Sequence, residues 1–192
     1  MRILQLLPEL KFGGVERGTV DLSEHLTKLG HQSAVVSAGG GLTEQLSDHG
    51  AKHFSLPIAK KNFLAIKQYK NLRDIYREFK PDIIHVRSRF PAWINVLALK
   101  GLSSSKPIVI STFHGLYSKP FYSKSMSYAN DIIAISKTVQ EYVFKNYDVD
   151  HSRVHLIYRG CDIDEFNTSP PSEAWSNSWY KEFPQTSDKI LL

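Results

Sequence analysis

Short apolar runs recur along this chain, and a stretch with helical periodicity follows most of them. The runs are almost continuously apolar, where a half-exposed strand would alternate apolar and polar residues. That composition is typical of strands in a parallel sheet, because helices cover both of its faces. The runs begin at Ile3, Ala34, His53, Ile83, Ile108, Ile132 and Val154.

The stretches between the runs place apolar residues at helical spacing. Within 15–29, the positions Val15, Leu22, Leu26 and Leu29 predict one buried helix face. Further helices are predicted over 62–79, 90–102 and 137–147. This alternation predicts an α/β fold, a Rossmann-like doubly wound parallel sheet of about seven strands with helices on both faces. Ligands in such folds collect at the carboxyl ends of the strands, so the residues after each run are the functional candidates.

The composition excludes several other classes of protein. Hydrophobic residues make up 42% and charged residues 22% of the 192 residues, which excludes a disordered chain. Cys161 is the only cysteine, so a disulfide framework is excluded and a reducing, cytoplasmic setting is favoured. The first residues do not match a signal peptide, and no apolar run is long enough to span a membrane. The net charge of +5 favours a polyanionic partner, which could be a phosphosugar, an anionic lipid surface or nucleic acid.

A pair of glycines, Gly13 and Gly14, follows the first apolar run. Glycines allow a sharp turn and a close approach of the backbone to a ligand. The helix that follows offers free N–H groups and the positive end of its dipole to a phosphate or a carboxylate. The pair is equally compatible with a tight strand-to-helix turn that binds nothing.

Two other strand ends carry polar side chains. Arg87, Ser88 and Arg89 follow the fourth run and could bind a phosphate or sugar hydroxyls, although arginines are also common in solvated surface loops. His114 and Gly115 follow the fifth run. A histidine there can accept a proton or hydrogen-bond a hydroxyl near neutral pH, and its position favours function over a purely structural role.

Two segments combine basic and apolar or aromatic residues. Residues 117–124 interleave tyrosines, a phenylalanine and lysines, and 60–80 form a basic amphipathic helix. Both patterns favour peripheral contact with an anionic membrane, although a surface loop and a solvated helix face explain them as well. Acidic residues are interspersed with the basic ones, so nucleic acid is not expected as a partner.

Motifs at successive strand ends resemble those of one known family. They are Gly13-Gly14-Val15-Glu16-Arg17, Lys80-Pro81-Asp82-Ile83-Ile84-His85, Thr112-Phe113-His114-Gly115, Asp131-Ile132-Ile133-Ala134-Ile135-Ser136 and Ile157-Tyr158-Arg159-Gly160-Cys161-Asp162. Over nearly its whole length, the chain resembles the N-terminal, acceptor-side half of a family 4 glycosyltransferase of the GT-B fold. Arg87-Ser88-Arg89-Phe90-Pro91-Ala92-Trp93 further resembles bacterial members that act in lipopolysaccharide or other cell-envelope sugar transfer.

The resemblance implies an activity and assigns roles to residues. Such enzymes transfer a sugar, here a hexose, from a nucleotide-sugar donor to a saccharide or glycolipid acceptor, usually with retention. By resemblance, His114 is the catalytic candidate, and the glycine pair lies against the donor diphosphate and the acceptor. The substrate-binding candidates are Gly13, Gly14, Glu16, Arg17, Arg87, Ser88, Arg89, Gly115, Arg159 and Gly160.

No metal site and no cofactor are predicted, and the nucleotide sugar is a co-substrate. Asp148-Val149-Asp150 and Asp162-Ile163-Asp164 mimic a metal-binding Asp-x-Asp motif, but the GT-B fold implied by the resemblance needs no such metal. The family also carries a Glu-x7-Glu motif in its donor-binding half. Glu16 with Glu24, and Glu165 with Glu173, have that spacing by accident.

The resemblance also divides the chain. Residues 1–166 are expected to form the acceptor-side domain, and 167–192 a linker and the start of a donor-binding domain, so that this half alone is inactive. The enzyme is expected in the cytoplasm or on the inner face of the cytoplasmic membrane. A sugar- or nucleotide-binding module without catalysis remains an alternative, and a basic nucleic-acid-binding protein is a further one.

Overall fold

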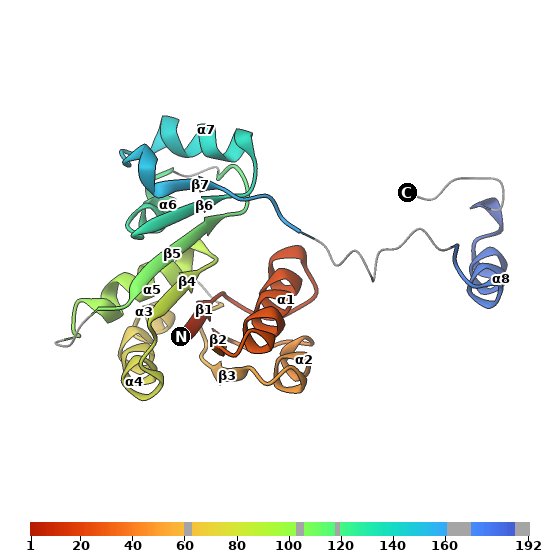
Figure 1. Cartoon of the computed structure of the whole chain (residues 1–192), viewed down its shortest axis with the longest axis horizontal. Helices are drawn as coiled ribbons and strands as arrows, with labels where there is room; N and C mark the ends of the chain where they lie inside the picture. The colour runs from red at the N-terminus through yellow and green to blue at the C-terminus, as the bar shows by residue number, and fades with distance from the viewer. Residues whose placement is uncertain (60–62, 103–105, 118–119, 161–169, 187–192) are drawn as a thin grey trace. The chain divides into compact units, whose positions relative to one another are not determined.

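The computed structural model describes residues 1–59, 63–102, 106–117, 120–160 and 170–186. The chain divides into two compact units, Met1–Tyr158 and Arg159–Leu192. The first unit contains a seven-stranded sheet with helices packed against it (Figure 1). The sequence-based division into 1–166 and 167–192 stays a prediction, because 161–169 lie outside the described residues.

The sheet is parallel throughout and follows the order β3-β2-β1-β4-β5-β6-β7. This is the order of a doubly wound Rossmann-like sheet, so the predicted fold class is confirmed. The strands are β1 (Arg2–Leu6), β2 (Gln32–Ser37), β3 (Lys52–Ser55), β4 (Ile83–Val86), β5 (Ile108–Phe113), β6 (Asp131–Ala134) and β7 (Val154–Leu156).

The helices of the first unit divide between the two faces of the sheet. One face is covered by α1 (Gly14–Lys28) and α2 (Thr43–Asp48), whose Val20 and Leu46 pack in a small core with Leu7 and Val35. The other face carries the larger core, built around side chains such as Leu4, Ile84 and Phe113. That face is covered by α3 (Phe63–Ile66), α4 (Tyr69–Phe79), α5 (Arg89–Leu99), α6 (Pro120–Ser127) and α7 (Lys137–Asn146).

The helix boundaries differ from the sequence-based ones in two places. The predicted helix over 62–79 is interrupted and forms α3 and α4, with a turn at Lys67 and Gln68. The aromatic and basic segment 117–124 overlaps α6, which runs from Pro120 to Ser127. Ser136 caps α7, because its Oγ accepts a hydrogen bond from the backbone N–H of Val139 at 3.2 Å.

The buried face of α1 is not the one that the leucine spacing predicts. Thr19, Val20 and Ser23 are fully buried, whereas Leu29 is 60% exposed. The reason lies in the strand beneath, because the fully buried Gln5 of β1 needs hydrogen-bond partners on α1. Polar and small side chains therefore displace the leucines from the interface.

The side of the sheet that carries α1 is less covered along β5, β6 and β7. Ile108 and Ile157 alternate to that side and are each 52% exposed, whereas their neighbours Val109 and Leu156 face the larger core side and are less exposed. Right-handed crossovers explain the difference. The connections from β1 to β3 run in one direction along the sheet and those from β4 to β7 in the other, so their helices lie on opposite faces.

The second unit contains α8 (Glu173–Glu182), a helix that carries Trp175 and Trp179. Ser172 caps it by accepting a hydrogen bond from the N–H of Trp175 at 3.2 Å. The two indole rings stack with their centroids 5.5 Å apart, and Trp179 also contacts Phe183. No residue of this helix is buried within its own unit.

The loop after β1 is fixed against the loop after β2. The backbone N–H of Leu10 donates to the carbonyl of Gly39 at 2.9 Å, and that of Leu42 donates to the carbonyl of Leu10 at 3.0 Å. Gly40 lies directly on this loop, because a Cβ there would stand 2.7 Å from the nitrogen of Lys11 and would collide with the carbonyl of Leu10. Gly40 therefore helps to set the position of the chain that leads to Gly13 and Gly14.

We predict that Gly40→Ala lowers the free energy of unfolding by about 2–4 kcal/mol, because it adds a backbone collision to the strain of a positive φ. Gly50→Ala is a matched control. Gly50 also has a positive φ, but no atom lies within 4 Å of its added Cβ, so it should cost only about 1 kcal/mol. Urea unfolding followed by circular dichroism measures both, and equal losses would contradict the assigned role of Gly40.

Candidate active site

β1 and β4 are neighbours at the point where the strand order reverses, and the carboxyl ends of all strands lie at the same edge. In open parallel sheets, ligands bind outside this edge at the reversal point. The loop after β1 leads to Gly13, and the loop after β4 begins with Arg87. Two of the predicted groups of residues therefore come from neighbouring loops at this edge.

The N-terminus of α1 carries its own negative charge. Gly13 is the N-cap residue with an extended backbone, and Gly14 is the first residue of the helix. The carboxylate of Glu16 folds back over Gly13, since a Cβ on Gly13 would collide with it. A carboxylate at this end of a helix interacts favourably with the helix dipole. An anionic ligand that approaches Gly13 and Gly14 would thus meet the Glu16 carboxylate first.

Gln5 orients Arg87 at the reversal point. The side-chain NH₂ of Gln5 donates to the carbonyl of Thr19 at 3.0 Å and to the Oγ of Ser23 at 2.8 Å. Because α1 uses the NH₂ group, the amide oxygen of Gln5 faces the other way and accepts a hydrogen bond from Nη1 of Arg87 at 3.3 Å. Arg87 is itself buried, and the hydrogen bond to the Gln5 amide oxygen fixes the position of its guanidinium.

His85 lies next to Gln5 in the register of β1 and β4 and is also buried. Its Nε2 lies 2.7 Å from Oγ1 of Thr112 on β5. Burial lowers the pKa of His85 well below its ordinary value, and the nearby Arg87 and His114 side chains lower it further. The side chain is therefore neutral at pH 7, and both Arg87 and His114 lie near it.

The loop that carries His114 is held by aromatic contacts. The guanidinium of Arg89 lies over the ring of Tyr117 at 4.7 Å and over that of Tyr122 at 5.2 Å from the ring centroids. The hydroxyl of Tyr142 donates to the carbonyl of Tyr117 at 2.5 Å. The backbone N–H of His114 donates to the Tyr117 hydroxyl at 3.3 Å. Arg89 thus supports the His114 loop through its contacts with the tyrosines.

The structure places the remaining predicted residues as follows. Arg17 is on the exposed side of α1, where its Nε lies 2.8 Å from the Asp21 carboxylate. Ser88 is the N-cap residue of α5, although its side chain makes no capping hydrogen bond. Gly115 follows His114 and has open space around it. Arg159 and Gly160 fall in the second unit.

The predicted residues are therefore brought together only in part. Arg87 follows β4, on which His85 lies, His114 follows the neighbouring strand β5, and Gly13, Gly14 and Glu16 form the start of α1. The substrate-binding and catalytic roles assigned to all of these residues stay predictions. Sequence reasoning missed Gln5, His85 and Thr112 as parts of the site. A signal existed, because Gln5 and His85 are polar residues inside otherwise apolar runs.

In the part of the chain that the structure describes, no three His, Cys, Asp or Glu side chains converge to hold a metal ion. Asp150 of the first Asp-x-Asp motif caps a short 3-10 helix, η1 (His151–Arg153), by accepting a hydrogen bond from the N–H of Ser152 at 2.9 Å. The second motif, from Asp162 to Asp164, lies outside the described residues. No helix in the described ranges is long and apolar enough to cross a bilayer.

The fold, its strand order and the polar edge define a Rossmann-like domain of the kind that binds ligands at the reversal point. Residues 12–165 match the family model of Glycosyltransferase Family 4. Because this match covers most of the chain, the chain belongs to glycosyltransferase family 4, as its motifs predicted. A search of curated proteins finds no match to the chain.

Solved structures of glycosyltransferases share the fold. A glycosyltransferase from Rickettsia africae ESF-5 is 30% identical with a TM-score of 0.79, and the match covers 97% of this chain and 50% of that one. Anabaena Alr3699/HepE in complex with UDP and glucose is 17% identical with a TM-score of 0.72, covering 94% of this chain and 50% of that one.

The lipopolysaccharide outer core galactosyltransferase WaaB is 19% identical with a TM-score of 0.70, and the match covers 90% of this chain and 49% of that one. The chain thus spans about half the length of these structures. At identities of 17% and 19%, HepE and WaaB support the fold and do not by themselves identify a substrate.

We predict that the neutral, buried His85 makes the stability of the protein fall in mild acid. In the unfolded chain His85 takes up a proton near its ordinary pKa of 6.5, whereas the folded protein resists protonation until a lower pH. Below pH 6.5 the unfolded state therefore binds more protons, and the free energy of unfolding should fall by up to about 1.4 kcal/mol per pH unit. Urea unfolding at several pH values should show a shallower fall for His85→Gln, and parallel curves would count against this assignment.

A second prediction concerns the Gln5 amide. Gln5→Leu conserves much of the side-chain volume but removes the three hydrogen bonds that the Gln5 amide makes with Arg87, Ser23 and the Thr19 carbonyl. Because these buried groups then lack a partner, the free energy of unfolding should fall by about 2–4 kcal/mol. Gln140→Leu is the matched control, because the Gln140 side chain makes one longer hydrogen bond, of 3.4 Å, to Val154. Its loss should stay below about 1 kcal/mol, and a similar loss in both variants would refute the proposed importance of the Gln5 network.

Proposed function

We propose that this chain is the acceptor-binding half of a glycosyltransferase that moves a hexose from a nucleotide sugar to a saccharide or glycolipid acceptor. The observation that supports this most is that Arg87 and His114 follow the neighbouring strands β4 and β5, beside the strand-order reversal. Such a reversal is the usual ligand position of the fold. Membership of glycosyltransferase family 4 gives the reaction class.

In the proposed reaction, the oxygen of the acceptor hydroxyl bonds to the anomeric carbon of the donor sugar while the bond to the diphosphate breaks, and the hydroxyl proton passes to the departing diphosphate. Gly13 and Gly14 at the start of α1 offer N–H groups to the departing diphosphate, whose negative charge grows in the transition state. His114 contacts the acceptor hydroxyl or the reacting sugar. Arg87, fixed by Gln5, binds an anionic or hydroxyl group of the acceptor. Transfer with retention and without a metal ion belongs to the proposal.

The acceptor is proposed to be a cell-envelope glycolipid or saccharide, with the enzyme in the cytoplasm or on the inner face of the membrane. Support comes from the exposed apolar side chain of Leu116, which is 59% exposed and lies two residues from His114 in the sequence. Two arginines in the described part of the basic segment 60–80 already have partners within the protein. Nε of Arg73 donates to the carbonyl of Ala98 at 3.1 Å, and Arg77 pairs with Asp74.

We predict that His114→Ala lowers kcat by roughly 10²–10⁴-fold, because the side chain that contacts the acceptor hydroxyl or the reacting sugar is lost. The protein to test carries this chain together with a donor-binding half. The measurement is UDP release and product formation from a panel of UDP-hexoses. His25→Ala, on the exposed side of α1, is the control and should retain activity. Unchanged kcat in His114→Ala would exclude His114 as the catalytic residue.

The isolated chain gives a separate test of the half-enzyme proposal. With no donor-binding half, it should neither hydrolyse nor transfer from any UDP-hexose. Steady turnover by the purified 192-residue chain would refute that proposal.

A further inference from the structure

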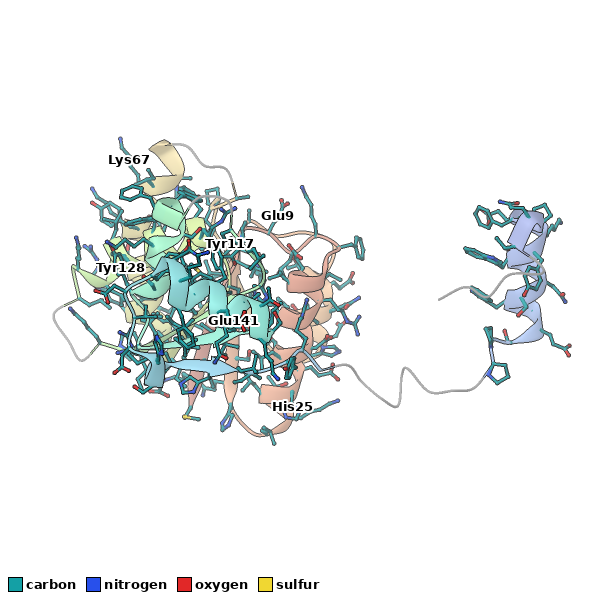
Figure 2. All side chains as sticks on the ribbon, turned by 90° about the horizontal axis from the view of Figure 1, so that it is seen from above. Glu9, His25, Lys67, Tyr117, Tyr128 and Glu141 are labelled. Carbon is teal, nitrogen blue, oxygen red and sulfur yellow. The ribbon has the colours of Figure 1, made fainter. Side chains whose placement is uncertain are left out.

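A cavity of about 520 Å³ lies beside α6 and the end of α7. Phe121, Lys124 and Tyr128 line it from α6 and the residue just after it, and Asn146, Asp148 and Arg153 line it from the segment that precedes β7. This is the amino-terminal edge of the parallel sheet, where β6 and β7 begin, and Arg87 and His114 lie at the opposite edge. Figure 2 labels Tyr128, which lines this cavity, and Glu9, which belongs to the loop after β1, at separate positions on the first unit.

Several walls of this cavity are fixed by contacts within the protein. Tyr128 makes an edge-to-face contact with Trp93, with ring centroids 6.1 Å apart. Nε of Arg153 donates to the carbonyl of Asn130 at 2.8 Å, and its Nη2 donates to the carbonyl of Ala129. Nδ2 of Asn146 donates to the carbonyl of Tyr142 at 2.8 Å. A ligand would thus meet groups that are already oriented, which reduces the entropy cost of binding.

The cavity combines exposed aromatic faces with planar polar groups. Phe121 is 83% exposed and Tyr128 is 51% exposed, so each ring offers a large apolar surface to a ligand. Asn146 can donate and accept hydrogen bonds, Asp148 accepts them, and Arg153 and Lys124 donate them. A sugar ring has apolar C–H faces for the aromatic rings and vicinal hydroxyls that both donate and accept. The volume falls within the range of ordinary small-molecule sites.

The helix ends disfavour a phosphate-bearing ligand. Ser127 and Asn146, the last residues of α6 and α7, both line the cavity. Helix C-termini present carbonyl oxygens and the negative end of the dipole, and Asp148 adds a carboxylate. Two of the N–H donors of Arg153 are already used by backbone carbonyls. A ligand rich in hydroxyl donors fits these surroundings better than a nucleotide or an inorganic anion.

We propose that this cavity is a saccharide-binding site, separate from the candidate active site and large enough for one or two sugar rings. It gives the chain a second point of attachment to a glycan, on the edge of the sheet opposite to the one where transfer is proposed. The binding itself needs neither a donor nor turnover, so it stands independently of the proposed transferase activity.

The test is a titration of the isotope-labelled 192-residue chain with maltose, lactose, cellobiose, mannobiose and chitobiose, followed by amide NMR shifts. At least one disaccharide should shift amides clustered in 121–128 and 146–153. Phe121→Ala should raise the Kd for that disaccharide about tenfold, because a stacking surface is lost. Asn146→Ala should raise it as well, and both residues are exposed, so neither substitution threatens the core.

Leu116→Ala is the control, because Leu116 is also a large exposed apolar residue but lies outside the cavity; its Kd should match that of the unchanged chain. The proposal is overturned if no disaccharide shifts these amides, if Phe121→Ala binds as tightly as the unchanged chain, or if UMP or phosphate shifts them while no sugar does. His114→Ala should leave the titration unchanged. Failure of the transferase proposal therefore appears in the activity assay alone, and failure of this one in the titration alone.

Discussion

Gln5 and His85 are neighbours in the register of β1 and β4, and both place polar groups in a layer that apolar side chains would otherwise fill. Buried polar groups lower stability unless each of them is hydrogen-bonded. Here α1 supplies the Thr19 carbonyl and the Ser23 hydroxyl, and β5 supplies Thr112. The layer is thus stable only while α1, β1, β4 and β5 keep their relative positions. Because Arg87 rests on this layer, its guanidinium has a defined place at the sheet edge.

The strand order explains why the polar layer lies where it does. At the reversal beside β1, the connection from β1 runs to one side of the sheet and the connection from β4 runs to the other. The loops after these two neighbouring strands therefore leave the sheet next to each other without crossing. The same reversal sends α1 to one face and α5 to the other. His85, on the α1 side of β4, therefore lies close to the carboxyl-terminal edge of the sheet, and the buried Arg87 follows directly after the strand.

The sheet and its parallel order could be predicted because continuous apolar runs record burial on both faces, a property of each segment by itself. The break between α3 and α4 could not be predicted, because the apolar spacing continues across Lys67 and Gln68. The polar inner face of α1 could not be predicted either, because it depends on the buried Gln5 of the strand beneath it. The strand-end positions of Arg87 and His114 followed from the sequence. The contribution of Gln5 and His85 did not, since it exists only through the register that pairs them and through the partners they find across three strands.

Charge at the start of α1 connects this buried layer with ligand binding. The helix dipole favours an anion at Gly13, and the Glu16 carboxylate lies over that residue. A diphosphate that binds there must displace this carboxylate or share the site with it, at a cost in repulsion. Arg87 at the neighbouring strand end supplies a positive charge that offsets such repulsion, and Gln5 joins it to α1 itself. In the proposed binding of a diphosphate at this edge, Glu16 and Arg87 would therefore act on the ligand charge in opposite directions.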